Sequence, residues 1–169
     1  MELENGMLDI DFDDLTHAYH RYTYKLEHCE ADWSKSTSLF ESDYVDGFAS
    51  GNTIDDVEQS LLTNTIYTHY HLSIPNDKCR PKLSGNYLLT IYDEDNNEVI
   101  KACFMVKEPL MRSMGVGLNI ITNTDATINT AHQQVEMELK YNSYNVTNPQ
   151  TQLKTVLLQN KRRDNARWN

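Results

Sequence analysis

The two histidines of His69-x-His71 have a spacing that is found in metal sites. Side chains two positions apart on a β-strand point to the same face, so neutral imidazoles at these positions can converge on one ion. A third ligand would come from elsewhere in the chain, such as His28 or an acid of residues 30–60. The alternative is that both histidines are polar residues on the exposed face of a sheet.

An acidic motif, Asp93-x-Asp95-x-Asn97, imitates the first half of a calcium-binding loop. The second half does not match, because the sixth position is Glu98 rather than Gly. The twelfth position is Phe104 rather than a bidentate Glu. The turn of a β-hairpin therefore explains this motif better than a calcium site does.

Carboxylates also gather at Asp11-Phe12-Asp13-Asp14 and at Asp55-Asp56-x-Glu58. Such clusters can chelate calcium weakly or act as paired acids, and they also occur as solvated strand edges or helix caps. Adjacent side chains on a strand point to opposite faces, so only Asp11 and Asp13 of the first cluster would share one. Solvated edges or caps are the simpler interpretation.

Recognisable catalytic motifs are absent from the sequence. It contains no G-x-S-x-G, Walker loop or H-E-x-x-H, and Gly115-x-Gly117 lacks the remaining glycine of a dinucleotide loop. No spacing assembles a serine nucleophile with a histidine base. We therefore predict a protein that is not an enzyme and that has no cofactor or resident metal.

Trp33, Tyr44 and Phe48 are the candidate partner-binding residues. They lie in a long polar segment, residues 30–60, and a segment of this length is usually a packed loop and sometimes a binding loop. Its aromatic rings can form a platform for a sugar or a protein partner. The alternative is that they cap one end of the core, because a small sandwich needs ring-sized side chains to fill it.

Alternation of apolar and polar residues predicts the strands that position these groups. The clearest unit is residues 87–106, where two β-branched and aromatic runs flank a short acidic break, as in a β-hairpin. Strands with one wet face are also predicted near residues 8–12, 22–28 and 66–74. Such strands are typical of a β-sandwich with antiparallel sheets.

A domain boundary is predicted at Pro109, where the sign of the net charge also changes. The first domain is then residues 1–108 and the second is residues 109–169. Three strands are predicted in the second part, although a two-layer sandwich generally needs about seven: residues 116–121, 135–141 and 153–159. A partial, truncated domain is expected, and its unpaired edge strands favour a dimer of this fragment through strand exchange.

Charge is distributed unevenly along the 169 residues, whose formal net charge is −10. Residues 1–108 carry 8 Lys and Arg against 21 Asp and Glu, whereas residues 109–169 carry 7 against 4. The acidic first part would repel phosphate, which excludes nucleic acid as its partner. The basic cluster Lys161-Arg162-Arg163 with Arg167 is too short to change this conclusion.

The sequence gives little direct information on the compartment. No apolar run approaches the roughly 18 residues of a membrane span, and Met1 does not lead into a secretory signal. Cys29, Cys79 and Cys103 are odd in number and lack C-x-x-C spacing. In an oxidising compartment one pair bridges, with Cys29–Cys79 the best candidate, whereas in a reducing one all three are small buried residues.

Several phrases, in order along the chain, carry a resemblance to a known family. In the first part they are His28-Cys29-Glu30-Ala31-Asp32-Trp33, Tyr44-Val45-Asp46-Gly47-Phe48, Tyr67-Thr68-His69-Tyr70, Ile74-Pro75-Asn76, Ser84-Gly85-Asn86-Tyr87-Leu88-Leu89 and Phe104-Met105-Val106-Lys107-Glu108-Pro109. In the second part they are His132-Gln133-Gln134-Val135, Gln159-Asn160 and Arg163-Asp164-Asn165-Ala166. These phrases resemble the plug protein family of the type IX secretion system of Bacteroidetes, over nearly the whole chain.

The resemblance implies an all-β fold: an immunoglobulin-like antiparallel β-sandwich followed by the opening strands of a second β domain. It also implies a longer, secreted, periplasm-facing protein that seals an outer-membrane β-barrel translocon and meets the membrane only through that partner. The family's signal peptide and C-terminal domains are missing from this chain, and no catalytic residues carry over. The alternative function is a carbohydrate-binding or glycan-associated cell-surface module that uses the same aromatic residues.

Overall fold

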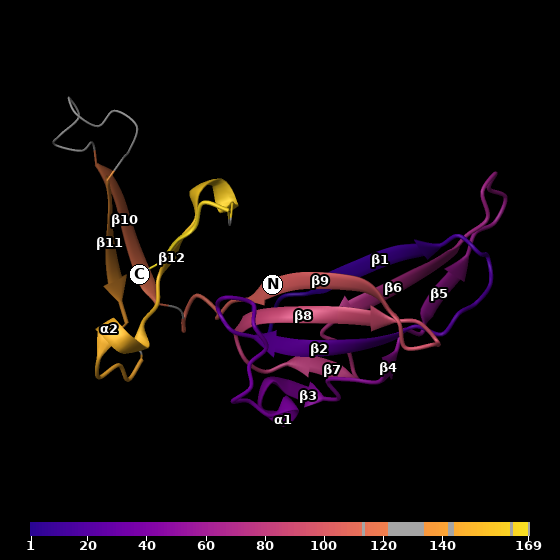
Figure 1. Ribbon diagram of the computed structural model, residues 1–169, viewed down its shortest axis with the longest axis horizontal. Coiled ribbons are helices and arrows are strands. Elements are labelled where there is room, and N and C mark those ends of the chain that lie inside the picture. The colour runs from indigo at the N-terminus through magenta and orange to yellow at the C-terminus, as the bar shows by residue number, and fades with distance from the viewer. Residues whose placement is uncertain (113, 122–133, 142–143, 163, 169) are drawn as a thin grey trace. The chain divides into compact units, whose positions relative to one another are not determined.

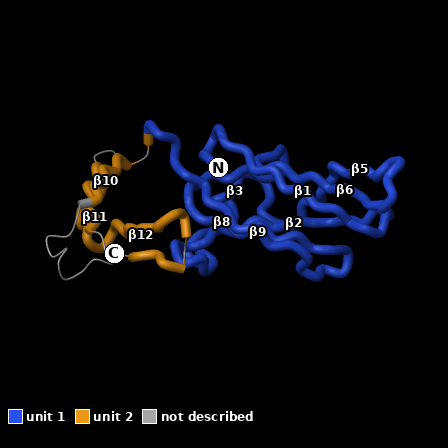
Figure 2. The backbone as a smooth tube through the Cα atoms, turned by 90° about the horizontal axis from the view of Figure 1, so that it is seen from above, with its two compact units in different colours: residues 1–111 blue, residues 112–169 orange. Residues whose placement is uncertain are grey.

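The computed structural model describes residues 1–112, 114–121, 134–141, 144–162 and 164–168 (Figure 1). The chain divides into two units, residues 1–111 and residues 112–169, which Figure 2 distinguishes by colour. Strands dominate both units, and each described helix is at most four residues long. In the described part of the chain, no helix is long and apolar enough to cross a membrane.

One sheet of unit 1 has three strands in the order β1-β6-β5: β1 (Leu8–Asp14), β6 (Thr68–Ile74) and β5 (Asp56–Gln59). All pairs are antiparallel, with Asp11 opposite His71 and His71 opposite Asp56. Buried and partly exposed residues alternate along β6, because one face packs inward and the other meets solvent. The predicted strand at 66–74 is therefore confirmed, although it begins at Thr68 and leaves Ile66 exposed.

The second sheet of unit 1 has four strands in the order β4-β2-β8-β9. Their bounds are β4 (Asn52–Thr53), β2 (Thr23–Cys29), β8 (Gly85–Tyr92) and β9 (Glu98–Val106). The β8–β9 hairpin predicted at 87–106 is confirmed, and Asp93 closes its turn by accepting hydrogen bonds from the N–H groups of Asp95 and Asn97. The motif that imitates a calcium loop is thus a hairpin turn.

The three-stranded and the four-stranded sheets of unit 1 enclose one core. It draws Tyr24 and Leu26 from β2, Leu89 and Ile91 from β8, and Tyr70 from β6 into a single buried cluster. Burial of each such side chain contributes about 1.5–3 kcal/mol. The arrangement confirms the prediction of an all-β sandwich, seen in Figure 1 as layered strands.

Residues 30–60 differ from the predicted loop, because they contain regular elements of their own. These are α1 (Glu41–Tyr44), β3 (Val45–Gly47), β4 and β5, and β3 pairs with β7 (Cys79–Pro81). The strands are two to four residues long, too short for apolar alternation to reveal them. The segment is instead tied to the sandwich by its backbone, as where the N–H of Leu26 donates to the carbonyl of Ala49 at 2.7 Å.

A polar cluster joins the end of β1 to the start of β2. The carboxylate of Asp14 accepts a hydrogen bond from Tyr22 at 3.0 Å and lies 2.7 Å from Nδ1 of His20. Burial opposes ionisation of Asp14, but hydrogen bonds from His20, Thr16 and Tyr22 outweigh it and lower the pKa of this carboxyl well below its usual range. Beside the cluster, the ring of Tyr22 meets that of Tyr70 edge to face.

Unit 2 consists of short elements, and its described strands pair in twos. They are β10 (Gly115–Ile121), β11 (Gln134–Lys140), α2 (Pro149–Gln152), β12 (Val156–Leu157), a 3-10 turn (Gln159–Lys161) and β13 (Arg167–Trp168). The predictions of strands at 116–121 and 135–141 are confirmed by β10 and β11. Residues His132, Gln133 and Arg163, which contribute to the sequence resemblance, lie outside the described residues.

The strand predicted at residues 153–159 is wrong in extent. Within it only Val156 and Leu157 pair with another strand, and a helical turn precedes residue 153. That turn begins at Pro149, and the side chain of Gln152 accepts hydrogen bonds from the backbone N–H groups of Thr147 and Asn148. A proline at the first position and this local hydrogen bonding favour a turn over a strand.

Candidate functional site

The three aromatic residues predicted to bind a partner occupy different environments. Phe48 is 72% exposed, Trp33 is half-buried and Tyr44 is 3% exposed. The ring of Tyr44 packs among the aromatic rings of His28 and Tyr87, so it belongs to the core. Tyr44 therefore does not form part of a surface that this conformation presents, which corrects its assignment as a contact residue.

Burial of Tyr44 makes it the anchor of an exposed segment. Four residues before it, Phe40 directly precedes α1 and is 77% exposed, and four residues after it Phe48 follows β3. Its backbone carbonyl accepts hydrogen bonds from the hydroxyl of Tyr87 and from the N–H of Lys82. We call residues 40–48 the aromatic–acidic segment, because its exposed members are Phe40, Glu41, Ser42, Asp43, Asp46, Gly47 and Phe48.

The geometry of the aromatic–acidic segment is fixed at both ends. At its start, the N–H of Phe40 donates to the carboxylate of Asp43 at 2.8 Å, and at its end the N–H of Phe48 donates to the carbonyl of Lys78 at 2.9 Å. Exposed rings held on a rigid backbone lose little conformational entropy on binding. The segment can therefore contact a partner through apolar rings and negatively charged neighbours.

Sequence reasoning did not select Phe40, nor did it select an apolar tip at the connection between β5 and β6. Leu61, Leu62 and Ile66 are all more than half exposed there. Two leucines inside a run of Ser, Thr and Asn are the pattern that could have indicated an exposed apolar tip. The tip lies apart in sequence from the aromatic–acidic segment.

His69 and His71 lie on the outer face of the three-stranded sheet. Nδ1 of His69 is 2.7 Å from Oδ1 of Asp13, and Nδ1 of His71 is 2.6 Å from Oδ1 of Asp11. Each imidazole is therefore held by a carboxylate of β1. Among the described residues, no group of three or more His, Cys, Asp or Glu is placed to hold a metal ion.

The surroundings of His71 include the order of groups found in hydrolase triads. Its Nδ1 faces Asp11, while its Nε2 is 3.0 Å from Oγ of Ser73. This pairing of a serine with a histidine was not foreseen from the sequence. Ser73, however, donates its own proton to Asp9 at 2.7 Å, so the histidine is not its acceptor in this arrangement.

The electrostatics of this face oppose acyl transfer at Ser73. Asp9, Asp11 and Asp13 follow one strand beside it, and negative charge developing on a substrate would be destabilised there. Loss of even one oxyanion donor costs about 100- to 1000-fold in rate. The backbone N–H groups of a paired strand are engaged in ladder hydrogen bonds and cannot supply such donors. The geometry supports an ion-pair surface rather than a catalytic centre.

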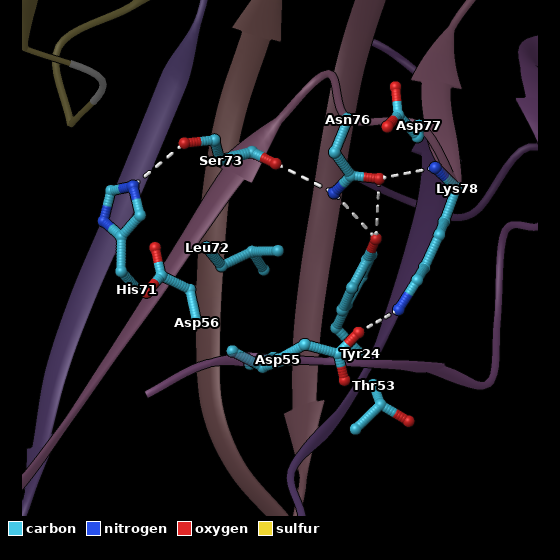
Figure 3. Close-up of a pocket in the computed structure, with 11 residues that line it drawn as sticks. Tyr24, Thr53, Asp55, Asp56, His71, Leu72, Ser73, Asn76, Asp77 and Lys78 are labelled. Carbon is cyan, nitrogen blue, oxygen red and sulfur yellow. Dashed lines mark hydrogen bonds and ion pairs between the residues drawn. The ribbon is translucent and has the colours of Figure 1, made fainter. Parts of the chain in front are cut away.

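A cavity of about 270 Å³ lies beside this face, between β6 and the turn that follows it (Figure 3). Tyr24 reaches it from β2, and its hydroxyl is 2.9 Å from Nδ2 of Asn76. Lys78 pairs with Asp55 at the cavity, and Asp56 and His71 also line it. The lining mixes apolar side chains with charged ones, among which carboxylates outnumber the one lysine, and this suits a small cationic group.

The three cysteines are free, so the bridge between Cys29 and Cys79 expected for an oxidising compartment does not form. Cys79 lies inside the core cluster, where burial raises the pKa of its thiol to about 12. Cys29 is buried as well, but it is not part of that cluster, and its thiol faces the carbonyl of Glu27. Cys103 is exposed on β9, unlike the small buried residue expected for a reducing compartment.

Comparison with known proteins finds a matching family model and matching solved structures. Residues 1–108 match a family model described as the first domain of the type 9 secretion system plug protein. A crystal structure at 2.30 Å of a hypothetical protein from Parabacteroides merdae ATCC 43184 is similar, with 40% sequence identity and a TM-score of 0.78. That match covers 96% of this chain and 40% of the other, so this chain spans less than half of that protein's length. No curated protein matches the chain.

Proposed function

The chain belongs to the type 9 secretion system plug protein family, and from this premise we propose that unit 1 is a non-catalytic module that contacts the secretion translocon. The observation that carries the proposal is the match of the first plug domain over residues 1–108. These residues are nearly the whole of unit 1. The translocon is an outer-membrane β-barrel in this proposal, and the module closes its periplasmic mouth.

The aromatic–acidic segment is the contact surface in this proposal. Aromatic residues are enriched among the residues that dominate protein–protein binding, and Phe40 and Phe48 are the most exposed of them in this part of the chain. The acidic charge of residues 1–108 favours a partner with a basic surface and speeds its approach. Trp33, which is half-buried, lies in the connection before the segment and is the third aromatic residue of this proposed surface.

The test is affinity capture of the full-length protein from detergent-solubilised outer membranes, read by mass spectrometry. Wild type is compared with a Phe40→Ala/Phe48→Ala variant, which leaves the buried Tyr44 in place. A Leu61→Ala/Leu62→Ala variant is the matched control, since it removes equally exposed apolar side chains from another loop. Far-ultraviolet circular dichroism establishes that each variant is folded.

The expected result is stoichiometric recovery of a large β-barrel by the wild type and the leucine variant, with loss of recovery for the phenylalanine variant. Recovery by all three proteins would reject the aromatic–acidic segment and retain the plug function. Loss with the leucine variant alone would move the contact to the apolar tip. Recovery of glycan-uptake proteins would replace the plug function with a glycan-associated one.

The non-catalytic part of the proposal has its own test at Ser73. Hydrolysis of an activated ester by wild type is compared with hydrolysis by Ser73→Ala. Equal, background rates are expected, because the carboxylates around Ser73 oppose an oxyanion. Activity that follows the purified wild type and disappears in Ser73→Ala would contradict a purely structural role.

A further inference from the structure

The outer face of the three-stranded sheet carries acids on both sides of its histidines. In the register of the sheet, Asp11 lies opposite His71 across the β1–β6 pair, and Asp56 lies opposite it on β5. Two residues away along β6, His69 lies opposite Asp13 of β1 and opposite Glu58 of β5. Directly opposed residues share a face in an antiparallel pair, so each imidazole stands between two carboxylates.

The contacts of this face run between β1 and β6. Nε2 of His69 also approaches Oδ1 of Asp11 at 3.4 Å, so this carboxylate links both histidines. Asp9 accepts the hydrogen bond of Ser73 and lies 3.8 Å from Nε2 of His71. We call Asp9, Asp11, Asp13, His69, His71 and Ser73 the carboxylate–histidine ladder.

β1 has a neighbouring strand on one side only, so its side-chain contacts with that neighbour matter more than they would for a central strand. β1 is an edge strand whose partner in the sheet is β6. Its inner face adds Phe12, which stacks on Tyr70 with ring centroids 5.1 Å apart. Its outer face offers only carboxylates. Asp9 keeps its hydrogen bond from Ser73 whatever the charge of the histidines, whereas Asp11 and Asp13 are attracted most strongly to β6 when the histidines are protonated. When the histidines are neutral, the charge repulsion of these carboxylates by Asp56 and Glu58 is no longer offset.

We propose that the carboxylate–histidine ladder is a pH-sensitive latch that fastens edge strand β1 to β6 in mildly acidic solution and loosens it above neutral pH. The latch changes the fraction of time for which β1 is open, while the apolar inner face of the strand keeps unit 1 folded.

The direction of each pKa shift decides whether the latch weakens or strengthens as the pH rises. Hydrogen bonding to Asp13 raises the pKa of His69, and hydrogen bonding to Asp11 raises that of His71, both above the ordinary value of 6.5. Their contribution is therefore fully present below pH 6.5 and is lost as the pH rises through the raised values. Hydrogen bonding to His71 lowers the pKa of Asp11 below its ordinary value of 3.8. The latch is consequently tightest between these two ordinary values.

Other charged groups face the ladder and enter the test. Asp55, Asp77 and Lys78 lie around the cavity beside His71. At the end of β1, His20 pairs with Asp14, and this hydrogen bond raises the pKa of His20. His20 therefore titrates in the same direction as the ladder, and a His20→Gln variant measures its share.

The experiment is hydrogen–deuterium exchange of the whole chain at about pH 5.5 and about pH 8.5, with each rate divided by the intrinsic rate at that pH. This ratio is the opening equilibrium constant, and for residues 8–14 it is expected to rise by roughly three- to tenfold at the higher pH. Residues 98–106 of β9 are the internal control. They form the edge strand of the other sheet and contain no histidine.

Two double variants separate charge from structure. In the His69→Gln/His71→Gln variant, residues 8–14 should exchange as fast at both pH values as they do in the wild type at the higher pH. Any remaining pH dependence should be the contribution of His20. His69→Lys/His71→Lys keeps positive charge at both values and should retain slow exchange throughout. Two results would overturn the latch. One is a wild-type change in corrected exchange between the two pH values that is the same for β1 as for β9, and the other is a full pH response that remains in the glutamine variant.

Discussion

The two units of the chain begin from similar antiparallel strands and reach different outcomes. In unit 1 the inner faces of two sheets meet, and side chains such as Leu26 and Ile91 are excluded from solvent. In unit 2 the hairpin of β10 and β11 has an equally apolar face, yet Leu118 and Ile120 on it are more than half exposed. Alternation in sequence thus specifies a strand, whereas stability depends on what covers its apolar face.

The register of the hairpin shows how complete its apolar face is. The opposed pairs on that face are Val116 with Leu139, Leu118 with Met137, and Ile120 with Val135. An isolated two-stranded hairpin is marginally stable in water, and three or more strands or a covering layer are needed. Unit 2 is therefore expected to be the less protected part of this chain.

The largest expected difference between the units comes from shortening one leucine in each. Leu26→Ala in unit 1 removes a fully buried side chain and should lower the free energy of unfolding by about 2–5 kcal/mol. Leu118→Ala in unit 2 should change it by no more than about 0.5 kcal/mol. Urea unfolding followed by tyrosine fluorescence measures both. Equal losses would show that unit 2 also has a core.

Glycine substitutions sharpen the same comparison. Gly47 in unit 1 has φ 95°, and a Cβ there would lie 2.2 Å from the carbonyl oxygen of Lys78. Gly47→Ala should therefore destabilise the protein by about 2 kcal/mol or more. In unit 2, a Cβ at Gly117 would meet Glu138 at an ordinary 3.6 Å, so Gly117→Ala should be nearly neutral. A neutral Gly47→Ala in thermal unfolding would mean that the backbone of β3 is not held as described.

Asp14→Asn tests the polar cluster between β1 and β2 of unit 1. Loss of a charged acceptor with several hydrogen bonds should cost about 1–3 kcal/mol near neutral pH. The lowered pKa of Asp14 means that its contribution is present above the ordinary value of 3.8 and is lost as the pH falls below it. The gap between the urea midpoints of wild type and variant should therefore be smaller at about pH 3 than at about pH 6. A gap of the same size at both pH values would assign the cost to packing instead.

The smallest expected effect is on the aromatic–acidic segment. Phe48→Ala removes an exposed ring and should change the free energy of unfolding by less than about 0.5 kcal/mol. This contrast with Leu26→Ala would show that the stability of unit 1 resides in its core and leaves the segment available for contact. A thermal shift of several degrees for Phe48→Ala would place that ring in the fold rather than at the surface.

Long alternating strands were predictable from the sequence because each buries one face. The hairpin of β8 and β9 and the strand β1 follow directly from this period of two. The elements between residues 30 and 60 were not predictable in this way, because β3 and β4 contain too few residues to show an alternation of apolar and polar side chains. Their placement is set by partners far along the chain. The carbonyl of Lys78, for example, accepts a hydrogen bond from the N–H of Phe48.

The candidate site was only partly predictable for a related reason. Composition drew attention to Trp33, Tyr44 and Phe48, but the residue type alone does not show whether an aromatic side chain lies in a core or on a surface. Only packing against Tyr87 assigns Tyr44 to the core. His69 and His71 were recognised as a pair, while the carboxylates of β1 that hold them come from more than 50 residues away.

The most direct test of the account is hydrogen–deuterium exchange of the protein alone and bound to the β-barrel recovered by affinity capture. The account predicts slower exchange on binding in peptides that span residues 40–48, where Phe40 and Phe48 are exposed. Unchanged exchange in those peptides, with slowing confined to other parts of the chain, would contradict the assignment of the contact surface.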